Sequence, residues 1–371
     1  MAGTGIDVDG AAATVEYVRW RPGRACTVLW SFPRADAAPL LVSGRLTGGD
    51  APQLGLNVFP HDDSLPGLPF AADATDVGAT VGLELAHAVA VAYKPTRRCV
   101  LRYTDAAGRP RLFGKVFRDD RGLPMPAWFA ALRARTSVWE LPVPVAYVPE
   151  QRLLLFEAVG GAAELAQLLR CRESSETAAA LAAVARAAEG LAEFRAVAVE
   201  GAPLVTPQEI LRPLDRGRRE LERALPDVAN EVSARLAELA QLARELAPEP
   251  VALAHGAFRA GQLLVRGERL VVLDLDSLCV AGVGMDPGCF LAGLDATGVR
   301  SPRLRPVLAR AEAAFTGRLD GVDARWVAWH RAAACVEHAL RRAYALEPEW
   351  PGRLAALLDC ADRALAVPAA A

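Results

Sequence analysis

The first 118 residues alternate apolar and polar positions with a period of two, which predicts β-strands. The pattern occurs twice, since EYVRWRPGRACTVLWSFPRADAAPLLVSGRLTGGD aligns with VAVAYKPTRRCVLRYTDAAGRPRLFGKVFRDD. The matched pairs are Pro22 and Pro95, Arg24 and Arg97, Cys26 and Cys99, Gly44 and Gly114, and Arg45 and Lys115. Turn residues divide each copy twice, so we expect three short strands per copy and a duplicated, sheet-rich unit.

The connecting segments predict a mixture of helix and hairpin. Residues 57–85 form a connector that is expected to end in a short helix. After the second copy, residues 125–141 predict a helix, and residues 143–159 predict a β-hairpin that turns at 149–151. The glycine pair at 160–161 predicts a hinge, because glycine lets the backbone bend at little cost.

Beyond the hinge the pattern becomes helical. Ser174 or Ser175 is expected to cap a helix over 176–197. Thr206 and Glu209 have the spacing of a capping box, with a proline at the first helical position. Further helices are predicted over 207–247, with a break near Pro226, and over 303–318, 323–345 and 350–366. One buried pair of strands is expected around 262–276.

Composition narrows the class of protein. A length of 371 residues fits two lobes that share a cleft, and 52% hydrophobic with 23% charged residues is typical of a folded protein. The net charge of −2 and the lack of a basic run argue against nucleic acid as a partner. The chain has no long apolar segment and no signal-like start, so we expect no membrane contact and a cytoplasmic location. Seven cysteines without a C-x-x-C pair fit reduced thiols.

Lysine is scarce in this chain. Lys94 and Lys115 are the two lysines among 42 basic residues, and both lie in the second strand copy. An ammonium and a guanidinium differ in shape and hydration, so a lysine kept in an arginine-rich chain suggests a specific role.

A polar island at 253–265, LAHGAFRAGQLLV, precedes the apolar run LVVLDLDSL. The island has the layout of a catalytic loop that runs into a strand. On a strand, Asp274 and Asp276 project from the same face, and two close carboxylates in an apolar run need a cation or donors. Magnesium that bridges nucleotide phosphates is the natural partner for them. The alternative is a strand end in solvent, where one aspartate caps the next turn.

The order of these elements resembles the aminoglycoside phosphotransferase and choline kinase group of the protein-kinase-like fold. The resemblance covers roughly residues 88–300, with specific motifs at 114–116 and 255–292. Members of the group show the motifs HGDxxxxN, I-D-F/W-D/E and GDPxxxDLA. The corresponding residues here are His255, Gly256, Ala257 and Gln262, then Leu273 to Asp276, then Met285, Asp286, Pro287 and Phe290.

The resemblance implies an α+β, bilobal protein-kinase-like fold. The expected parts are the first β copy with its connector at 1–87, a kinase-like N-lobe at 88–158, and a helical C-lobe at 159–371 that carries the catalytic-loop and metal-strand remnants. The first β copy is expected to extend the sheet of the second, to cover a neighbour's edge or to bind a peptide by strand addition.

The resemblance also implies a nucleotide site with ATP and Mg²⁺. Lys115, Lys94 and Arg97 are the expected phosphate ligands, the last two from a KPTRR turn that replaces a glycine-rich lid. The expected metal ligands are Asp274, Gln262 and Asp276. His255 and Asp286 are expected to hold the loop. The helix over 125–140 offers Arg133, Arg135 and a terminal Glu140, so the glutamate that orients the kinase lysine is missing.

Ala257 decides between the functions that this fold allows. It occupies the position of the aspartate that takes the acceptor proton, and Asp276 is the possible substitute. One hypothesis is a pseudokinase, a nucleotide-binding protein with impaired catalysis. The alternative is an active, divergent phosphotransferase with an alcohol group as acceptor on a small molecule or peptide, possibly in specialised metabolism. A third is transfer of another part of the nucleotide. The acceptor and any protein partner are not readable from the sequence.

Overall fold

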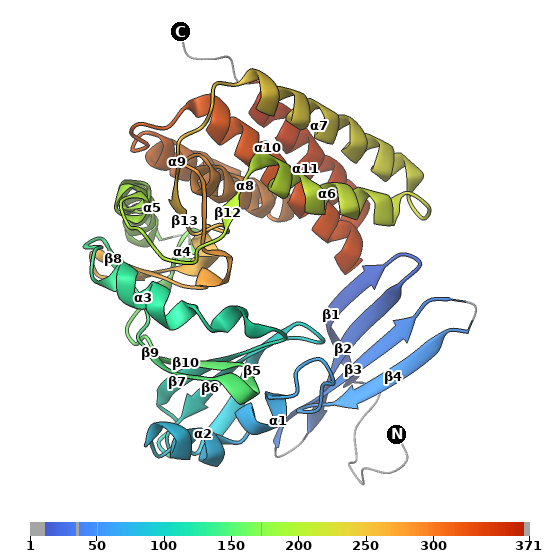
Figure 1. Cartoon of the computed structure of the whole chain (residues 1–371), viewed down its shortest axis with the longest axis vertical. Coiled ribbons are helices and arrows are strands. Elements are labelled where there is room, and N and C mark those ends of the chain that lie inside the picture. Colours follow the sequence, from blue (N-terminus) through green and yellow to red (C-terminus); the bar gives the residue numbers. More distant parts are fainter. Residues whose placement is uncertain (1–11, 35–36, 50, 172, 367–371) are drawn as a thin grey trace. The chain divides into compact units, whose positions relative to one another are not determined.

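Two antiparallel sheets form the N-terminal part of the chain in a computed structural model, which describes residues 12–34, 37–49, 51–171 and 173–366 (Figure 1). The first sheet has the order β1-β2-β3-β4 and the second the order β5-β6-β7-β10-β9. The strands of the first sheet are β1 (Thr14–Arg21), β2 (Ala25–Arg34), β3 (Ala37–Thr47) and β4 (Gln53–Val58). Those of the second are β5 (His87–Lys94), β6 (Arg98–Thr104), β7 (Pro110–Phe117), β9 (Pro144–Val148) and β10 (Leu153–Glu157).

The chain divides into two units. The first comprises the residues up to Pro126, Val143–Gly160 and Tyr344–Leu346, and the second comprises Ala127–Pro142, Gly161–Ala343 and the residues from Glu347. Each unit is described by itself below.

Both strand copies contain the same contact between an aromatic ring and a glycine. A Cβ atom at Gly44 would lie 2.6 Å from the Trp30 ring, and one at Gly114 would lie 2.8 Å from the Tyr103 ring. The two aromatic residues are equivalent in the sequence alignment, as are the two glycines. The three predicted strands are thus confirmed in each copy, and their shared glycine leaves room for a ring that crosses the neighbouring strand. Common origin by duplication stays a prediction.

The core of the first unit lies under the second sheet. Helices α1 (Leu68–Ala71) and α2 (Ala74–Val81) come from the predicted connector and cover this sheet (Figure 1). Fully buried Tyr103 donates a hydrogen bond from its hydroxyl to the carbonyl oxygen of Ala71 at 2.6 Å. The connector is therefore part of the core rather than a loose link.

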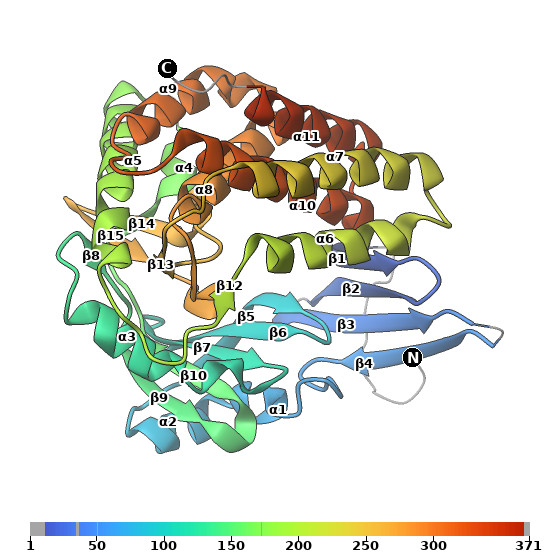
Figure 2. The same cartoon turned by 45° about the horizontal axis from the view of Figure 1, so that its top comes forward.

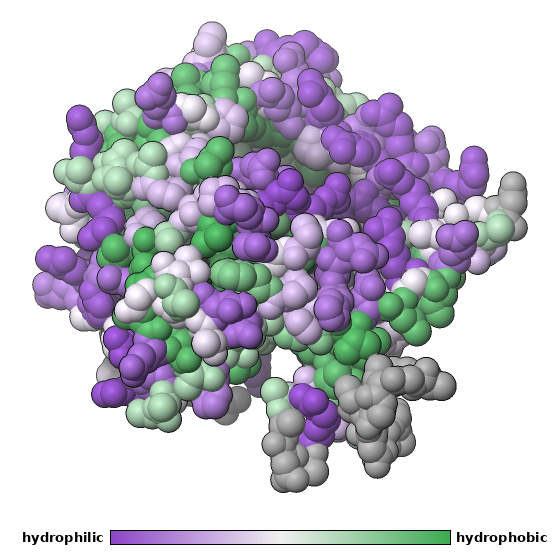
Figure 3. Space-filling model, turned by 60° about the horizontal axis from the view of Figure 1, so that its bottom comes forward, coloured by the Kyte–Doolittle hydropathy of each residue, from purple (hydrophilic) through white to green (hydrophobic). Residues whose placement is uncertain are grey.

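The first sheet keeps several apolar side chains in solvent. Val15, Leu46, Leu54 and Leu56 are each about half exposed or more. Figure 3 shows hydrophobic residues in green on the right, the side on which Figure 1 draws this sheet. Leu46 and Leu54 are direct cross-strand neighbours, so part of this apolar surface is continuous.

The second unit combines two small sheets with helices. Its sheets have the orders β11-β14-β15-β8 and β12-β16-β13. The strands are β8 (Trp139–Glu140), β11 (Ala163–Glu164), β12 (Leu204–Val205), β13 (Val251–Ala254), β14 (Leu263–Arg266), β15 (Arg269–Val272) and β16 (Cys279–Gly282). The helices are α3 (Met125–Arg133), which begins at the unit boundary, α4 (Leu165–Leu168), α5 (Ser174–Arg195), α6 (Pro207–Leu221), α7 (Pro226–Glu245), α8 (Met285–Arg300), α9 (Arg305–Thr316), α10 (Ala324–Ala345) and α11 (Trp350–Leu365).

Most of the predicted helices are confirmed. The Thr206 side chain and Glu209 form the predicted capping box at the start of α6, and the break near Pro226 separates α6 from α7. These two helices pack side by side in an antiparallel pair (Figures 1 and 2). Among the described residues, no helix has the length and apolar character needed to cross a membrane.

Two helix boundaries were predicted wrongly. The helix expected over 125–141 ends at Arg133. Beyond that point, the Thr136 hydroxyl donates to the Leu132 carbonyl oxygen, and the two residues Trp139 and Glu140 form a strand that pairs with β15. Helix α5 begins at Ser174, so its N-cap is Glu173 and not one of the two serines; the Glu173 side chain makes no capping hydrogen bond.

Helix α8 was not predicted. Its first residues, Met285 to Gly288, contain a proline and a glycine, which normally weaken a helix. Pro287 lies in the first turn, where its missing N–H removes no helical hydrogen bond. Gly288 is needed there, because its Cβ would lie 2.5 Å from the Cβ of His330 on α10.

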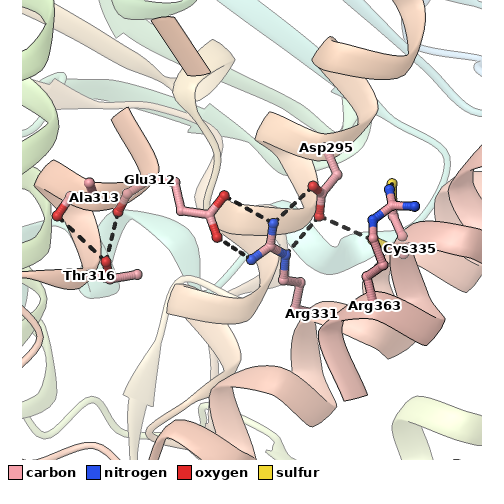
Figure 4. A network of polar contacts seen from close by, with 8 residues as sticks. Asp295, Glu312, Ala313, Thr316, Arg331, Cys335 and Arg363 are labelled. Atoms are coloured by element: carbon pink, nitrogen blue, oxygen red, sulfur yellow. Dashed lines mark hydrogen bonds and ion pairs between the residues drawn. The ribbon is translucent and has the colours of Figure 1, made fainter. Parts of the chain in front are cut away.

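Arg331 on α10 joins three helices. Its guanidinium donates two hydrogen bonds to Asp295 of α8, at 2.7 and 2.9 Å, and also pairs with Glu312 of α9 at 2.5 Å (Figure 4). Cys335 donates its thiol to the same Asp295 carboxylate at 3.6 Å. Burial opposes the charge on Arg331, but the hydrogen bonds to both carboxylates raise its pKa. The guanidinium therefore fixes α8 against α9 and α10.

Candidate functional site

The predicted catalytic loop begins at His255, directly after β13. The His255 and Gly256 backbone N–H groups both donate to the Asp286 carboxylate, at 2.7 and 2.9 Å. Asp286 lies in the first turn of α8 and is 5% exposed. Burial raises the pKa of Asp286, whereas the two N–H groups and nearby Arg195 lower it. The prediction that Asp286 anchors the loop is confirmed.

His255 has the structural role that was expected from the sequence. Its ring is fully buried, and Nε2 lies 2.8 Å from the carbonyl oxygen of Leu273, just after β15. Its ring also contacts Phe258 edge to face, with the ring centroids 5.8 Å apart. The imidazole thus joins the loop to the end of β15.

Gly256 permits a close approach between two loops. Its φ of +76° lies in the left-handed region, and a Cβ atom there would lie 2.0 Å from the carbonyl oxygen of Ser277. Ser277 ends the short 3-10 turn Leu275–Ser277, which carries Asp276. The Asp276 turn is therefore a direct neighbour of the predicted catalytic loop.

The next residue is Ala257, which is half buried. Its methyl group cannot accept a proton. The same loop carries Arg259, half buried, and Gln262, which is 4% exposed.

Asp274 and Asp276 are not on a strand, contrary to the prediction. Strand β15 ends at Val272, and Asp274 has a φ of +66°. This left-handed residue turns the chain so that Leu275 enters the core with no exposed surface. The period-2 argument that placed both carboxylates on one strand face therefore does not apply.

Gln262 and Asp274 nevertheless lie together. Gln262 donates its Nε2 amide to Asp274 Oδ2 at 3.3 Å. Its Oε1 atom is buried and accepts no hydrogen bond within the described part of the chain. A buried amide oxygen beside a carboxylate fits a hard cation such as Mg²⁺, which prefers oxygen ligands. Among the described residues, no cluster of three or more His, Cys, Asp or Glu is arranged to hold a metal. These side chains thus fit an ion that receives its other ligands from phosphate and water.

Phe290 occupies the position where the resembling family has its last aspartate. It is fully buried and stacks on Phe315, with centroids 4.2 Å apart and planes at 14°. It also contacts Phe258, which meets Trp139 edge to face. This position belongs to an aromatic row in the core of the second unit and carries no polar function.

In the first unit, Lys115 lies on β7. Its neighbours across the sheet are Val100 and Leu154, and the residue is 8% exposed. Its Nζ atom lies 5.4 Å from the centre of the Phe117 ring, a cation–π contact. Lys115 is therefore not a solvated strand lysine.

The KPTRR turn between β5 and β6 is held by a residue that sequence reasoning missed. Asp62, 5% exposed, accepts hydrogen bonds from the Thr96 backbone N–H at 2.7 Å and from the Tyr93 hydroxyl at 2.8 Å. Thr96 has a φ of +63°. The Thr96 N–H is therefore used internally. Lys94 is half buried and Arg97 is exposed.

Glu140 was expected at the end of a helix, but it does not lie on a helix. It lies on β8 and pairs with Arg266 of β14. Helix α3 itself contains no glutamate or aspartate. Of the charged residues expected on this helix, Arg133 lies on α3, whereas Arg135 and Glu140 lie beyond its end.

Comparison with known families gives a match over most of the chain. A model of a phosphotransferase enzyme family matches residues 97–335. No curated protein matches the sequence significantly.

Solved structures of low sequence identity share the fold. A choline/ethanolamine kinase family protein from Mesorhizobium loti is 15% identical, covers 82% of this chain and 94% of its own, and has a TM-score of 0.53. The GDP complex of aminoglycoside 2'-phosphotransferase-IIIa is 13% identical, with 78% and 97% coverage and a TM-score of 0.56. An amicoumacin kinase with AMP-PNP and Ca²⁺ is 14% identical, with 74% and 88% coverage and a TM-score of 0.52. The predicted α+β, kinase-like fold is confirmed.

Proposed function

Because the chain belongs to the phosphotransferase enzyme family, we propose that it binds ATP with Mg²⁺ and transfers phosphate inefficiently or not at all. One observation carries this proposal: the loop from His255 is anchored to buried Asp286, while Ala257 stands where the family motif has an aspartate. A loop that is held in place but carries no proton acceptor is expected of a protein that binds a nucleotide without rapid turnover.

Lys115 is proposed to contact the nucleotide phosphates. Its ammonium lies on a sheet and is largely removed from bulk water, which strengthens its attraction to an anion. Lys94 and Arg97 at the β5–β6 turn are proposed to add phosphate contacts through their side chains. Two of the structures that share the fold contain GDP or AMP-PNP, which supports a nucleotide as ligand.

Asp274 and Gln262 are proposed to hold the magnesium ion, with Asp276 as a further ligand. The ion would neutralise phosphate charge when it is bound. The Gln262 side chain is one methylene longer than the asparagine of the family motif, and a displacement of about 1 Å at such a site can cost about 10² in rate. Phe290 leaves a further motif position without a polar group.

The missing base alone lowers the rate by about 10²- to 10⁴-fold in enzymes of known mechanism. Since Gln262 and Phe290 also depart from the motif, we expect Ala257→Asp to restore little transfer. The test is incubation of wild type and Ala257→Asp with ATP labelled in its γ-phosphate and a panel of alcohols. A large gain in labelled product for Ala257→Asp would show that the rest of the site is intact and would contradict the proposal.

An active phosphotransferase is the second candidate, with Asp276 as the base. It is favoured by the contact between the Asp276 turn and the loop, at the position where Gly256 meets Ser277. In that case wild type transfers phosphate, and Asp276→Asn lowers the rate by at least about 10². Identification of the product also distinguishes phosphate transfer from transfer of another part of the nucleotide.

A further inference from the structure

A cavity of about 360 Å³ in the second unit has a strongly basic lining. It is bounded by the loop at Arg259 to Gly261 and by parts of α8, α10 and α11, with the β11–α4 segment on one side. This volume is typical of small-molecule sites. The basic residues of its lining are Arg170, Arg259, Arg300, Arg341, Arg342 and Arg353, together with His338.

Carboxylates offset part of this charge. Glu164 lines the cavity, and Glu337 pairs with Arg341 at 2.6 Å. Glu347 pairs with Arg342 and Arg353, and Glu349 pairs with Arg353. Six guanidinium groups thus face four carboxylates, so an excess of two positive charges remains around the cavity.

Arg170 and Arg300 carry this excess. Within the described part of the chain, neither forms an ion pair with a carboxylate, whereas Arg341, Arg342 and Arg353 each form at least one. Burial lowers the pKa of Arg300, and so do the neighbouring charges of Arg170, Arg342 and Arg353, whereas the Glu347 carboxylate raises it. Both arginines are exposed, so water screens part of this repulsion, and a bound anion would relieve the rest.

His338, which also lines the cavity, is affected by the same arginine charges. Its burial and the charges of Arg341, Arg259, Arg342 and Arg300 lower its pKa to about 3. The ring is therefore neutral at physiological pH and offers a hydrogen bond without adding charge.

We propose that this cavity binds a small dianion or polyanion, a molecule with two or more phosphate or carboxylate groups. The planar guanidinium groups suit such a ligand, because each can donate two parallel hydrogen bonds to a phosphate or carboxylate. Arg259 and Gly261 place the ligand beside the predicted catalytic loop. In an active protein, a hydroxyl group of such a ligand would accept the γ-phosphate of ATP, with ADP as the leaving group and the hydroxyl proton released. Binding itself needs neither catalysis nor nucleotide, and the inference extends the proposed function.

The test is calorimetric titration without Mg²⁺ at low ionic strength, with inorganic pyrophosphate and citrate as probes and glucose as the neutral control. The first variant is Arg170→Gln with Arg300→Gln, which removes two positive charges. Its control is Arg244→Gln, an exposed arginine on α7, which removes one positive charge away from the cavity. We expect pyrophosphate or citrate to bind wild type and Arg244→Gln equally, and to bind the double variant at least about tenfold more weakly. Arg300→Lys, which keeps the charge, should retain more affinity than Arg300→Gln.

Two readouts separate this site from the nucleotide site. Lys115→Met should leave citrate binding unchanged, and the double arginine variant should leave binding of ATP with Mg²⁺ unchanged. Saturation with citrate should also raise the pKa of His338, followed through its ring resonances by NMR, because an anion offsets the arginine charges.

Equal affinity of wild type and the double variant for both probes, or no binding at all, would overturn the inference and leave the nucleotide proposal standing. Loss of citrate binding in Lys115→Met would show that the probe occupies the nucleotide site instead. Tight binding of pyrophosphate alone identifies phosphate as the recognised group, and tight binding of citrate alone identifies carboxylate.

Discussion

Replacement of Asp286 tests the claim that one buried carboxylate holds the catalytic-type loop. Asp286→Ala removes the acceptor of two backbone N–H groups, those of His255 and Gly256. A buried N–H group without a partner costs about 1–3 kcal/mol, so two cost about 2–6 kcal/mol. Removal of a charge from a site that is 5% exposed recovers part of this, because burial disfavours the ionised carboxylate. We therefore expect a loss of about 2–4 kcal/mol.

Asp286→Asn separates the hydrogen bonds from the charge. The amide keeps one acceptor oxygen and presents an NH₂ group to the second N–H. Asp286→Asn should therefore lower the unfolding free energy by about 1–3 kcal/mol. The assay is urea unfolding followed by tryptophan fluorescence. Asp359→Ala, an exposed aspartate on α11, is the control and should stay within about 0.5 kcal/mol of wild type.

Amide hydrogen exchange gives the local version of the same test. The amides of His255 and Gly256 should exchange faster in Asp286→Ala than the loss of global stability explains, since their acceptor is gone. The reasoning is refuted if Asp286→Ala unfolds within 0.5 kcal/mol of wild type and its loop amides keep their protection.

Three further substitutions test other parts of the second unit. Arg331→Met should lower the unfolding free energy, measured in urea, by about 2–4 kcal/mol. The loss should be smaller than for a fully buried ion pair, because the Glu312 side chain is 39% exposed. Gly256→Ala should cost at least about 2 kcal/mol in the same assay, since its methyl meets the Ser277 carbonyl, and should weaken magnesium-dependent ATP binding through the displaced loop. The unfolding free energy of His338→Gln should fall less steeply than that of wild type as the pH is lowered from 6 to 4. In wild type the unfolded state binds a proton below about pH 6.5 and the folded histidine does not until about pH 3, a slope of up to about 1.4 kcal/mol per pH unit.

Each of these has an outcome that contradicts it. Unchanged stability of Arg331→Met would mean that α8, α9 and α10 need no shared guanidinium. A Gly256→Ala protein with wild-type stability would show that the loop has room to move. Identical pH profiles for wild type and His338→Gln would show that His338 protonates alike in both states.

The sequence predicted features that depend on local chemistry. The Thr206 capping box and the break at Pro226 follow from hydrogen bonds and φ restrictions within a few residues. The aromatic and glycine positions of the two strand copies are visible in the alignment, although their contact is not. Motif order indicated the kinase-like fold because it records the order of elements rather than their packing.

Features that depend on tertiary contacts were missed or misplaced. The left-handed φ of Asp274 lets Leu275 reach the core, and period-2 alternation contains no information about that turn. Asp62 lies in an irregular connector, 34 residues before Thr96, whose N–H group it accepts. The arginines that line the basic cavity lie far apart in the sequence, at positions between 170 and 353. In an arginine-rich chain, no local cluster of basic residues therefore indicates the cavity.

Calorimetric titration with ATP in the presence and absence of Mg²⁺ tests the central claim most directly. The account predicts that wild type binds ATP, that Mg²⁺ strengthens binding, that Lys115→Met loses most of the affinity, and that Asp274→Asn loses the effect of Mg²⁺. Absence of binding by wild type, or equal binding by wild type and both variants, would contradict it.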